Sequence, residues 1–270
     1  MTHSDTLIDV WAHNLYESVS KLQDMAERAA YIFIDAEFPG VVASVEGGFV
    51  DLIDMDYQDK RENSNLMHPI QYGFAFFDEN KRRIEGPCAI QFNFKWDKDK
   101  DTCSYKSLKF LEDKGFDFSK LATDGIDYTE FAEAIIGSGL ICNHKVSYIG
   151  FQCDYDIIYL LKLCSGLTRL PMNHDDLGQI MKVYFPCVYD FRYVTLRFHF
   201  FMGLSTIGAK FDVPHVGGSH HAGNDALFTG DVYFRFLEVY ENYDINEFRN
   251  CVYGVTHVGY RGKDYVKPQF

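Results

Sequence analysis

The chain has 270 residues, of which 47% are hydrophobic and 16% aromatic, and its formal net charge is −13. This composition excludes a disordered chain, and the charge argues against a protein that grips nucleic acid through a broad basic face. It does not exclude a nuclease, because carboxylates that hold divalent cations add to the negative charge.

The first predicted element is an amphipathic helix over residues 8–30, in which apolar residues recur at helical spacing. A short apolar run, Tyr31–Ile34, follows and is typical of a strand buried on both faces. Asp35 and Glu37 continue this strand and point the same way, roughly 6.5 Å apart along it, before Pro39-Gly40 ends it. Such a pair is either two solvated acids at a strand end or a site for a hard cation such as Mg²⁺ or Mn²⁺.

Further along the chain, the polar segment 44–66 is predicted to be a long loop. Two apolar runs around a polar turn, Ile70–Phe77 and Cys88–Phe94, complete an antiparallel meander with the first strand. Then the pattern predicts a strand over Val146–Phe151 among helices over Ser107–Lys114, Tyr128–Ile136, Asp154–Cys164, Asp175–Phe185, Leu204–Phe211 and residues 224–241. This order predicts an α/β fold with a mixed central sheet flanked by helices.

No repeat or low-complexity linker divides the chain, so we expect one domain over residues 1–270, with a loosely docked tail over 243–270. The seven cysteines are scattered and form no C-x-x-C pair, which indicates reduced thiols. The apolar runs are far shorter than a membrane span, and no basic region followed by an apolar one opens the chain. We expect a soluble protein of the cytoplasm, or also of the nucleus.

Two more acids lie where a predicted strand is followed by a helix. Asp156 is in the first turn of the helix after Val146–Phe151, and Asp225 is in the first turn of the last long helix. A helix N-terminus favours an anion, which keeps such an acid ionised and ready for a metal. Simple helix capping is the alternative for each, and Asp154 is placed equally well to act as a cap.

His220 stands five residues before Asp225, in a loop that contains Gly217, Gly218 and Gly223. The glycines allow this histidine to fold back over the start of the helix. An isolated histidine is more often structural, but beside four acids it becomes a candidate general base. His221 offers a second imidazole at the same place.

The order D-x-E, then D, then H-x-x-x-x-D resembles the DEDD-type exonucleases with a catalytic histidine, which have an RNase H-like (DnaQ-like exonuclease) fold. Longer segments resemble the Caf/Pop family of poly(A) deadenylases, the nuclease subunits of the Ccr-Not complex: IDAEFPGVVA, IQYGFAFFDEN, IQFNFKW, YDIIYLLKL, VYFPCVYDFRY and HHAGNDALFTG. These segments cover nearly the whole chain.

The resemblance implies that His220 is the base and that the ligands of two divalent ions, Mg²⁺ or Mn²⁺, are Asp35, Glu37, Asp156 and Asp225. It also implies a 3′-5′ exoribonuclease that acts on the poly(A) tail of mRNA and releases 5′-AMP. We expect one ion, on Asp35, Glu37 and Asp225, to activate water, and Asp35 with Asp156 to serve the other. The implied partners are the Not scaffold and a second deadenylase subunit.

The chain departs from the family in two places. Gln152 and Asp154 replace residues of the family motif beside the site, which puts metal affinity in question, and Val194–Gly203 lacks the family's basic character. Two other interpretations remain open: a scaffold subunit whose nuclease site has decayed, and a DEDD exonuclease that trims other RNA or DNA ends.

Overall fold

The computed structural model describes residues 6–47, 52–215, 220–241 and 244–257. Its centre is a sheet in the order β1-β4-β3-β2-β5-β6, which confirms the predicted mixed sheet and the predicted meander. Neighbours β4, β3 and β2 are antiparallel, whereas β1 runs parallel to β4, β5 to β2 and β6 to β5. The strand bounds are Leu7–Val10 (β1), Tyr31–Glu37 (β2), Gln71–Phe77 (β3), Ala89–Asn93 (β4), Ser147–Gly150 (β5) and Val188–Asp190 (β6).

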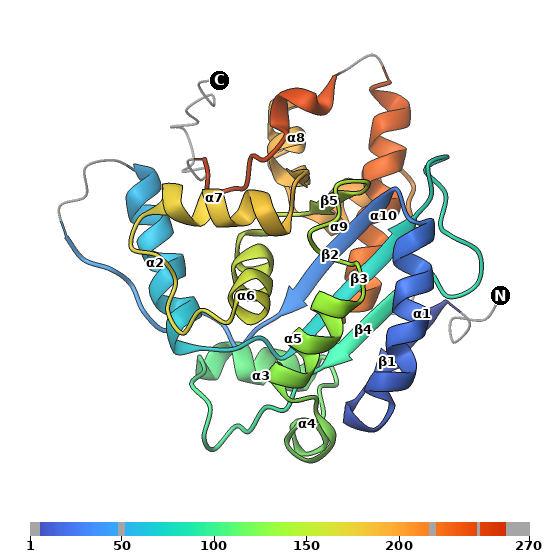
Figure 1. Ribbon diagram of the computed structural model, residues 1–270. Helices are drawn as coiled ribbons and strands as arrows, with labels where there is room; N and C mark the ends of the chain where they lie inside the picture. The colour runs from blue at the N-terminus through green and yellow to red at the C-terminus, as the bar shows by residue number, and fades with distance from the viewer. Residues whose placement is uncertain (1–5, 48–51, 216–219, 242–243, 258–270) are drawn as a thin grey trace.

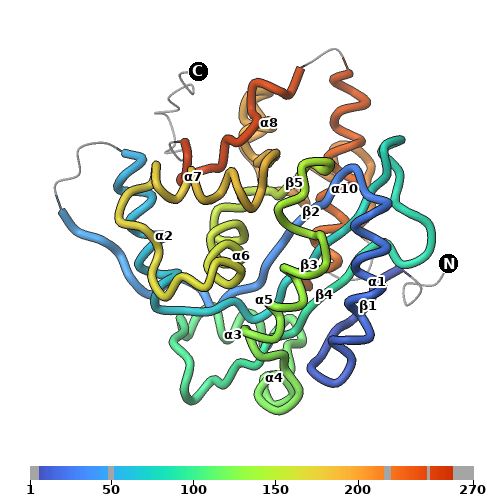
Figure 2. The backbone as a smooth tube through the Cα atoms, viewed as in Figure 1, coloured from blue at the N-terminus to red at the C-terminus, as the bar shows by residue number. Residues whose placement is uncertain are grey.

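Helices cover both faces of the sheet (Figure 1). Phe33 of β2 packs edge-to-face on Tyr233 of α10 with ring centroids 5.5 Å apart, so α10 lies on that face. On the opposite face, Tyr72 of β3 stacks on Phe131 of α5. The tube in Figure 2 shows α10 behind β2 and β3, although these elements are far apart in the sequence. The helices of the two layers are α10 (Ala222–Val239) on one face, and α1 (Leu15–Arg28), α5 (Tyr128–Gly137) and α6 (Asp154–Ser165) on the other.

The N-terminal helix is shorter than predicted, because Leu7–Val10 forms the edge strand β1. The Asp9 carboxylate accepts hydrogen bonds from Gln91 Nε2 and Asn93 Nδ2 of β4, at 3.1 and 2.8 Å. A 3₁₀ turn, Ala12–Asn14, follows, and α1 begins at Leu15. The apolar spacing of this segment fits a helix as well as a strand, and the long-range pairing decides between them.

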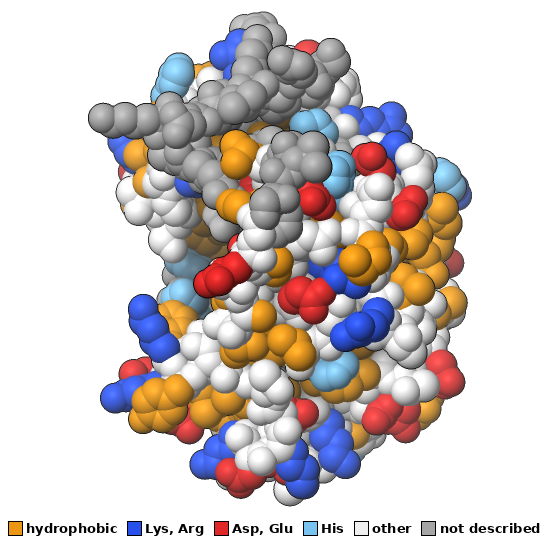
Figure 3. All heavy atoms as spheres, turned by 90° about the vertical axis from the view of Figure 1, so that its left-hand side faces the viewer, with side chains coloured by type: hydrophobic (Ala, Val, Ile, Leu, Met, Phe, Trp, Pro, Cys, Tyr) orange, Lys and Arg blue, Asp and Glu red, His pale blue; other side chains and the backbone are white. Residues whose placement is uncertain are grey.

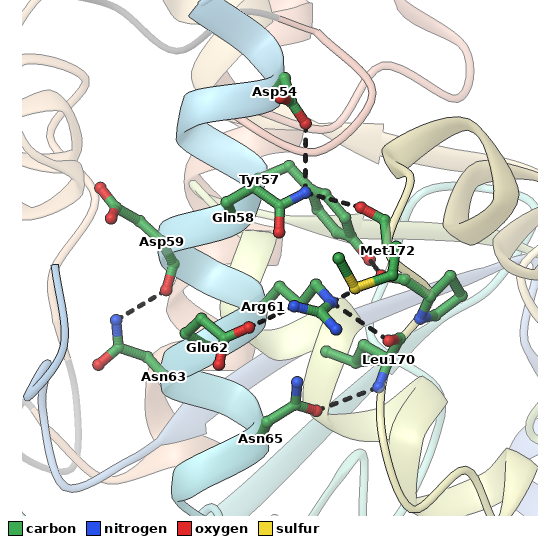
Figure 4. Close-up of polar contacts among 11 residues, drawn as sticks. Asp54, Tyr57, Gln58, Asp59, Arg61, Glu62, Asn63, Asn65, Leu170 and Met172 are labelled. Carbon is green, nitrogen blue, oxygen red and sulfur yellow. Dashed lines mark hydrogen bonds and ion pairs between the residues drawn. The ribbon is translucent and has the colours of Figure 1, made fainter. Parts of the chain in front are cut away.

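The predicted loop 44–66 is wrong over its second half, which is helix α2 (Leu52–Leu66). Figure 4 shows polar side chains of α2 reaching the segment 170–172. Gln58 Nε2 donates to Met172 O at 2.6 Å and Arg61 Nε to Leu170 O at 3.3 Å. This helix is held by hydrogen bonds rather than by an apolar stripe, so its sequence lacks the helical pattern. Residues 48–51 lie outside the described part.

The other predicted helices are confirmed to within three residues at each end, as α3 (Tyr105–Asp113), α5, α6, α7 (His174–Tyr184), α9 (Leu204–Lys210) and α10. Three further short elements were not predicted: α4 (Phe118–Asp124), β6 and α8 (Phe191–Arg197). Each is too short for a periodic pattern to stand out.

The C-terminal segment packs more closely than predicted. A 3₁₀ turn, Ile245–Phe248, leads to Val252 and Val255, which are fully buried. Asn250 exchanges two hydrogen bonds with Val188 of β6, at 2.7 and 3.0 Å. The prediction of a loose tail is therefore wrong for 244–257, and 258–270 lie outside the described residues.

The surface carries both signs of charge. On the face in Figure 3, lysine and arginine side chains are scattered among acidic and hydrophobic ones. In the part of the chain that the structure describes, no helix has the length and apolar content to cross a membrane.

Candidate active site

The acidic half of β2 faces helix α10. Asp35 pairs with Gly73 and Glu37 with Gln71 across the β2-β3 ladder, on the same face as Phe33. Burial raises the pKa of Asp35, and the nearby charges of Asp225, Asp156 and Glu37 raise it further. Burial, followed by the charge of Asp225, raises the pKa of Glu37 to about 8. Strand and helix thus gather carboxylates that repel one another in the absence of a cation.

Gly73 lets the start of α10 sit directly on the sheet. A Cβ atom at this position would lie 2.0 Å from the Ala222 carbonyl carbon, so no side chain fits there. Two glutamine side chains then cap the helix: Gln71 Oε1 accepts from Ala222 N at 2.8 Å, and Gln91 Oε1 accepts from Gly223 N at 3.1 Å. These contacts place Asp225, in the first turn of α10, opposite β2, and the sequence analysis did not find them.

Asp156 approaches from the first turn of α6, as predicted. Its carboxylate is buried, which raises its pKa, and the charge of Asp154 raises it further. The buried Tyr72 hydroxyl donates to the Asp156 backbone carbonyl and so ties α6 to β3. Since the charge of Asp156 also raises the pKa of Asp35, the predicted acids from β2, α6 and α10 share one site.

His220 folds back over the start of α10, as predicted. It adopts φ 67°, and its backbone N–H donates to Asp225 Oδ2 at 2.9 Å. One ligand atom from each of Glu37, His220 and Asp225 lies within 4.8 Å of the others. Burial lowers the pKa of His220, although Asp225 opposes the shift, so the imidazole is neutral at pH 7. Gly217 and Gly218 of the predicted loop lie outside the described residues.

The other two histidines near the site are placed differently. The His221 ring stacks on Phe116, with centroids 5.1 Å apart, and is absent from the three-residue cluster. His215, which the sequence analysis did not select, has its Nε2 2.8 Å from Asp225 Oδ1 and stacks on Phe228. His215 thus lies beside the Asp225 carboxylate, but the contact lacks hydrogen-bond geometry.

The added carboxylate, Asp154, has a partner of its own. Lys60 Nζ of α2 lies 3.3 Å from Asp154 Oδ2, and the two side chains are 12% and 8% exposed. Burial raises the pKa of Asp154, and Lys60 opposes the shift. Asp154 is thus neither a simple cap nor a free acid beside the site, and the unpredicted helix α2 supplies the cation.

Gln152 lies in the turn between β5 and α6, at φ 55°. Its backbone N–H donates to Asp190 Oδ1 at 2.8 Å, and Asp190 Oδ2 accepts from Tyr253 N at 3.0 Å. Burial raises the pKa of Asp190 to about 7, although these backbone donors oppose the shift. Asp190 therefore anchors the turn that carries Asp156, and the sequence analysis missed this role.

The donor set fits divalent cations. Glu37, His220 and Asp225 form a cluster, and the charges of Asp225, Asp156 and Glu37 all act on Asp35. Among the described residues, no lysine or arginine forms an ion pair with Asp35, Glu37, Asp156 or Asp225. Oxygen-rich sites of this kind suit Mg²⁺ and Mn²⁺.

Comparison with known proteins gives a consistent result. Residues 10–136 match the model of the CAF1 family ribonuclease. The poly(A) ribonuclease pop2 of Schizosaccharomyces pombe is 34% identical over 253 residues, which are 93% of this chain and 75% of that protein.

Solved structures agree with this match. The Mg²⁺- and Mn²⁺-bound form of S. pombe Pop2p superposes with a TM-score of 0.88 over 92% of this chain and 99% of that one, at 34% identity. CAF1 co-crystallised with the yeast NOT1 MIF4G domain gives a TM-score of 0.77 at 25% identity, over 92% of this chain and 96% of that one. E. coli exonuclease I, at 13% identity and a TM-score of 0.53 over 80% of this chain and 41% of that one, shares the fold, which is RNase H-like.

Proposed function

Since the chain belongs to the CAF1 family of ribonucleases, we propose that it is a poly(A)-specific 3′-5′ exoribonuclease that shortens mRNA tails and releases 5′-AMP. The observation that carries the proposal is the cluster of Glu37, His220 and Asp225, whose ligand atoms lie within 4.8 Å of one another. Asp35 and Asp156 extend it from two further positions. A decayed nuclease site would be expected to lack at least one of these five residues.

Asp35, Glu37, Asp156 and Asp225 would hold two divalent ions, Mg²⁺ or Mn²⁺, the ions bound by the S. pombe relative. When bound, such ions lower the pKa of the attacking water and neutralise charge on the phosphate and leaving oxygen. Burial and neighbouring negative charges raise the pKa values of Asp35, Glu37 and Asp156. A cation at the site would favour their ionised forms.

His220 would act as the general base. A neutral imidazole has one ring nitrogen with a free lone pair, which can take a proton from the attacking water. The hydrogen bond from its backbone N–H to Asp225 fixes the main chain of His220 beside the carboxylates.

The partners would be the Not scaffold and a second deadenylase subunit. For the scaffold, the support is the similarity to CAF1 in its crystal with the NOT1 MIF4G domain. The second subunit and a cytoplasmic or also nuclear location follow from the family resemblance. Recruitment by partners would offset the weak attraction of RNA to an acidic chain.

A time course on 5′-labelled RNA that ends in a run of adenosines tests the function, with Mg²⁺ and then Mn²⁺. We expect a ladder that shortens from the 3′ end and stops at the first other base. Asp35→Ala should abolish it together with metal binding, whereas Glu27→Ala, an exposed acid on α1, should not. Equal rates on U, C and DNA homopolymers would indicate a general trimming exonuclease, and no ladder with either ion would indicate a scaffold subunit.

A further inference from the structure

Helix α3 forms a wall of the candidate active site. Its first residues meet the turn after β2, where Ser104 N donates to Pro39 O at 2.8 Å. Gly40 lies so close that a Cβ atom there would be 2.1 Å from Ser107 Oγ. The helix is therefore fixed to the turn that follows Asp35 and Glu37.

The inner side of α3 is anchored in a second apolar cluster. Leu111 is buried there together with Trp11, Trp96 and Phe116. Phe116 also stacks on His221, next to the candidate base. Anchoring at both catalytic segments makes α3 a rigid element rather than a loop that closes on substrate.

On its outer side, α3 presents Phe110 beside the candidate base. The Phe110 ring packs edge-to-face on His220 with centroids 4.7 Å apart, yet 44% of the residue is exposed. The exposed part of this ring is open to a ligand, and covering it would remove apolar surface from water. Its contact with His220 places it beside the proposed general base.

Three lysines lie on α3 or directly after it, in a chain with a formal net charge of −13. Lys106 and Lys109 are exposed on α3, and Lys114 Nζ lies 5.4 Å from the Phe110 ring centroid. Lys106 is three residues from Lys109 and four from Phe110, so it neighbours both on the helix surface. A π-face between cations suits a nucleotide, because its base stacks and its phosphates are anionic, whereas an apolar peptide would gain nothing from the lysines.

We propose that Phe110 is the stacking platform for an adenine base at the 3′ end of the RNA, and that Lys106 and Lys109 bind phosphates of the neighbouring nucleotides. The proposal rests on the proposed function, since it takes the reacting phosphate to lie at the carboxylates. The substrate subsite would then lie on α3, a helix that was predicted from the sequence without a functional role.

The lysine part is tested by the salt dependence of RNA binding. The double substitution Lys106→Gln/Lys109→Gln should flatten the plot of log affinity against log salt by about 0.7 for each phosphate that the protein no longer neutralises. The decrease in affinity should be similar for A and U oligomers. Lys145→Gln, in the turn before β5 at the opposite end of the sheet, is the matched control; an equal slope in all three proteins would overturn the assignment of these lysines to phosphates.

The stacking part is tested with an A-tailed RNA whose 3′-terminal base is 2-aminopurine, bound in Ca²⁺, with a gel to verify that the RNA stays intact. Stacking should quench the fluorescence in the wild type and in Phe110→Tyr. Phe110→Ala and Phe110→Leu should lose the quench, and Phe110→Ala should weaken binding about 5- to 150-fold, which is the range for one stacked base. Tyr16→Ala, on α1, should behave as wild type.

Mn²⁺ titration and thermal melting of each variant check that the metal site and the fold persist. Unchanged quench and affinity in Phe110→Ala, with an active wild type, would overturn the subsite alone. A wild type that quenches but never shortens RNA in Mg²⁺ would overturn the proposed function and keep the subsite. A wild type that binds no RNA would overturn both.

Discussion

The face of β2 that meets α10 has an aromatic half and an acidic half. In the first half, Tyr31 and Phe33 pack against rings of α10, and the centroids of Tyr31 and Phe234 lie 5.0 Å apart. In the second half, the same strand and helix bring together Asp35 and Asp225. The character changes completely within two residues of β2, while the backbone pairing continues unchanged to its end.

The two halves affect stability in opposite directions. Burial of aromatic rings stabilises the fold, and edge-to-face pairs add about 0.5 to 1.5 kcal/mol each. Gathered acids destabilise the metal-free fold, since each raised pKa marks an ionised form that folding disfavours. The aromatic half therefore holds the acidic half together, and a local rule of folding is broken only where function requires it.

The largest expected effect is on catalysis. His220→Ala should lower kcat about 10²- to 10⁴-fold, because the proton acceptor is removed. His221→Ala is the matched control; its ring lies outside the cluster of Glu37, His220 and Asp225, so any decrease should be much smaller. Single-turnover rates on A-tailed RNA measure both, and a larger decrease in His221→Ala would reverse the assignment of the base.

A substitution in the aromatic half should lower the stability of the fold and leave kcat unchanged. Phe33→Ala should lower the free energy of unfolding by about 3 to 5 kcal/mol, since it removes a fully buried ring. The protein that remains folded should keep its kcat. Urea unfolding and kcat are measured on the same sample; a selective decrease in kcat would show that the halves are not separable.

The ion pair between Lys60 and Asp154 allows the acidic half to be perturbed from α2, a helix outside it. Lys60→Met should destabilise the fold by about 3 kcal/mol, because it leaves Asp154 buried without its cation. Mn²⁺ binding should not weaken, since the loss of the Lys60 charge leaves Asp154 as an additional negative charge near Asp156. The double substitution Lys60→Met/Asp154→Leu should recover most of the stability, and calorimetry can follow both quantities.

A change of one pH unit, without any substitution, should have the smallest effect. The folded pKa of Glu37 is raised from 4.5 to about 8, so the metal-free folded state binds more protons than the unfolded state between these values. Its stability should therefore fall as pH rises from 4.5 to about 8, by up to about 1.4 kcal/mol per pH unit for one proton. Urea titrations in a chelator would show the slope, and saturating Mn²⁺ should reduce or reverse it.

The sequence predicted the features that depend on local pattern. Asp35 and Glu37 interrupt a strongly apolar strand, and Asp225 lies in the first turn of a long helix. These local patterns were enough to predict all three acids as site residues. The backfolding of His220 followed from the glycines beside it. The sheet and most helices followed from the periodicity of their apolar residues.

Features that depend on partners distant in the sequence could not be predicted from it. Leu7–Val10 is a strand because β4 pairs with it, and α2 is a helix because its polar side chains bond to 170–172. Asp190 and Gln71 act through backbone groups remote in sequence. Nothing local to these residues distinguishes them from ordinary polar ones.

Gly73 has a consequence for folding fidelity. If β3 slipped by one residue against β2, its side chains would change faces and Tyr72 or Phe74 would occupy the place where α10 meets the sheet. Only the correct register leaves room for the helix, and only the helix brings Asp225 to Asp35. A misregistered molecule would be unable to assemble the cation site, so metal binding would distinguish correctly folded molecules from misfolded ones.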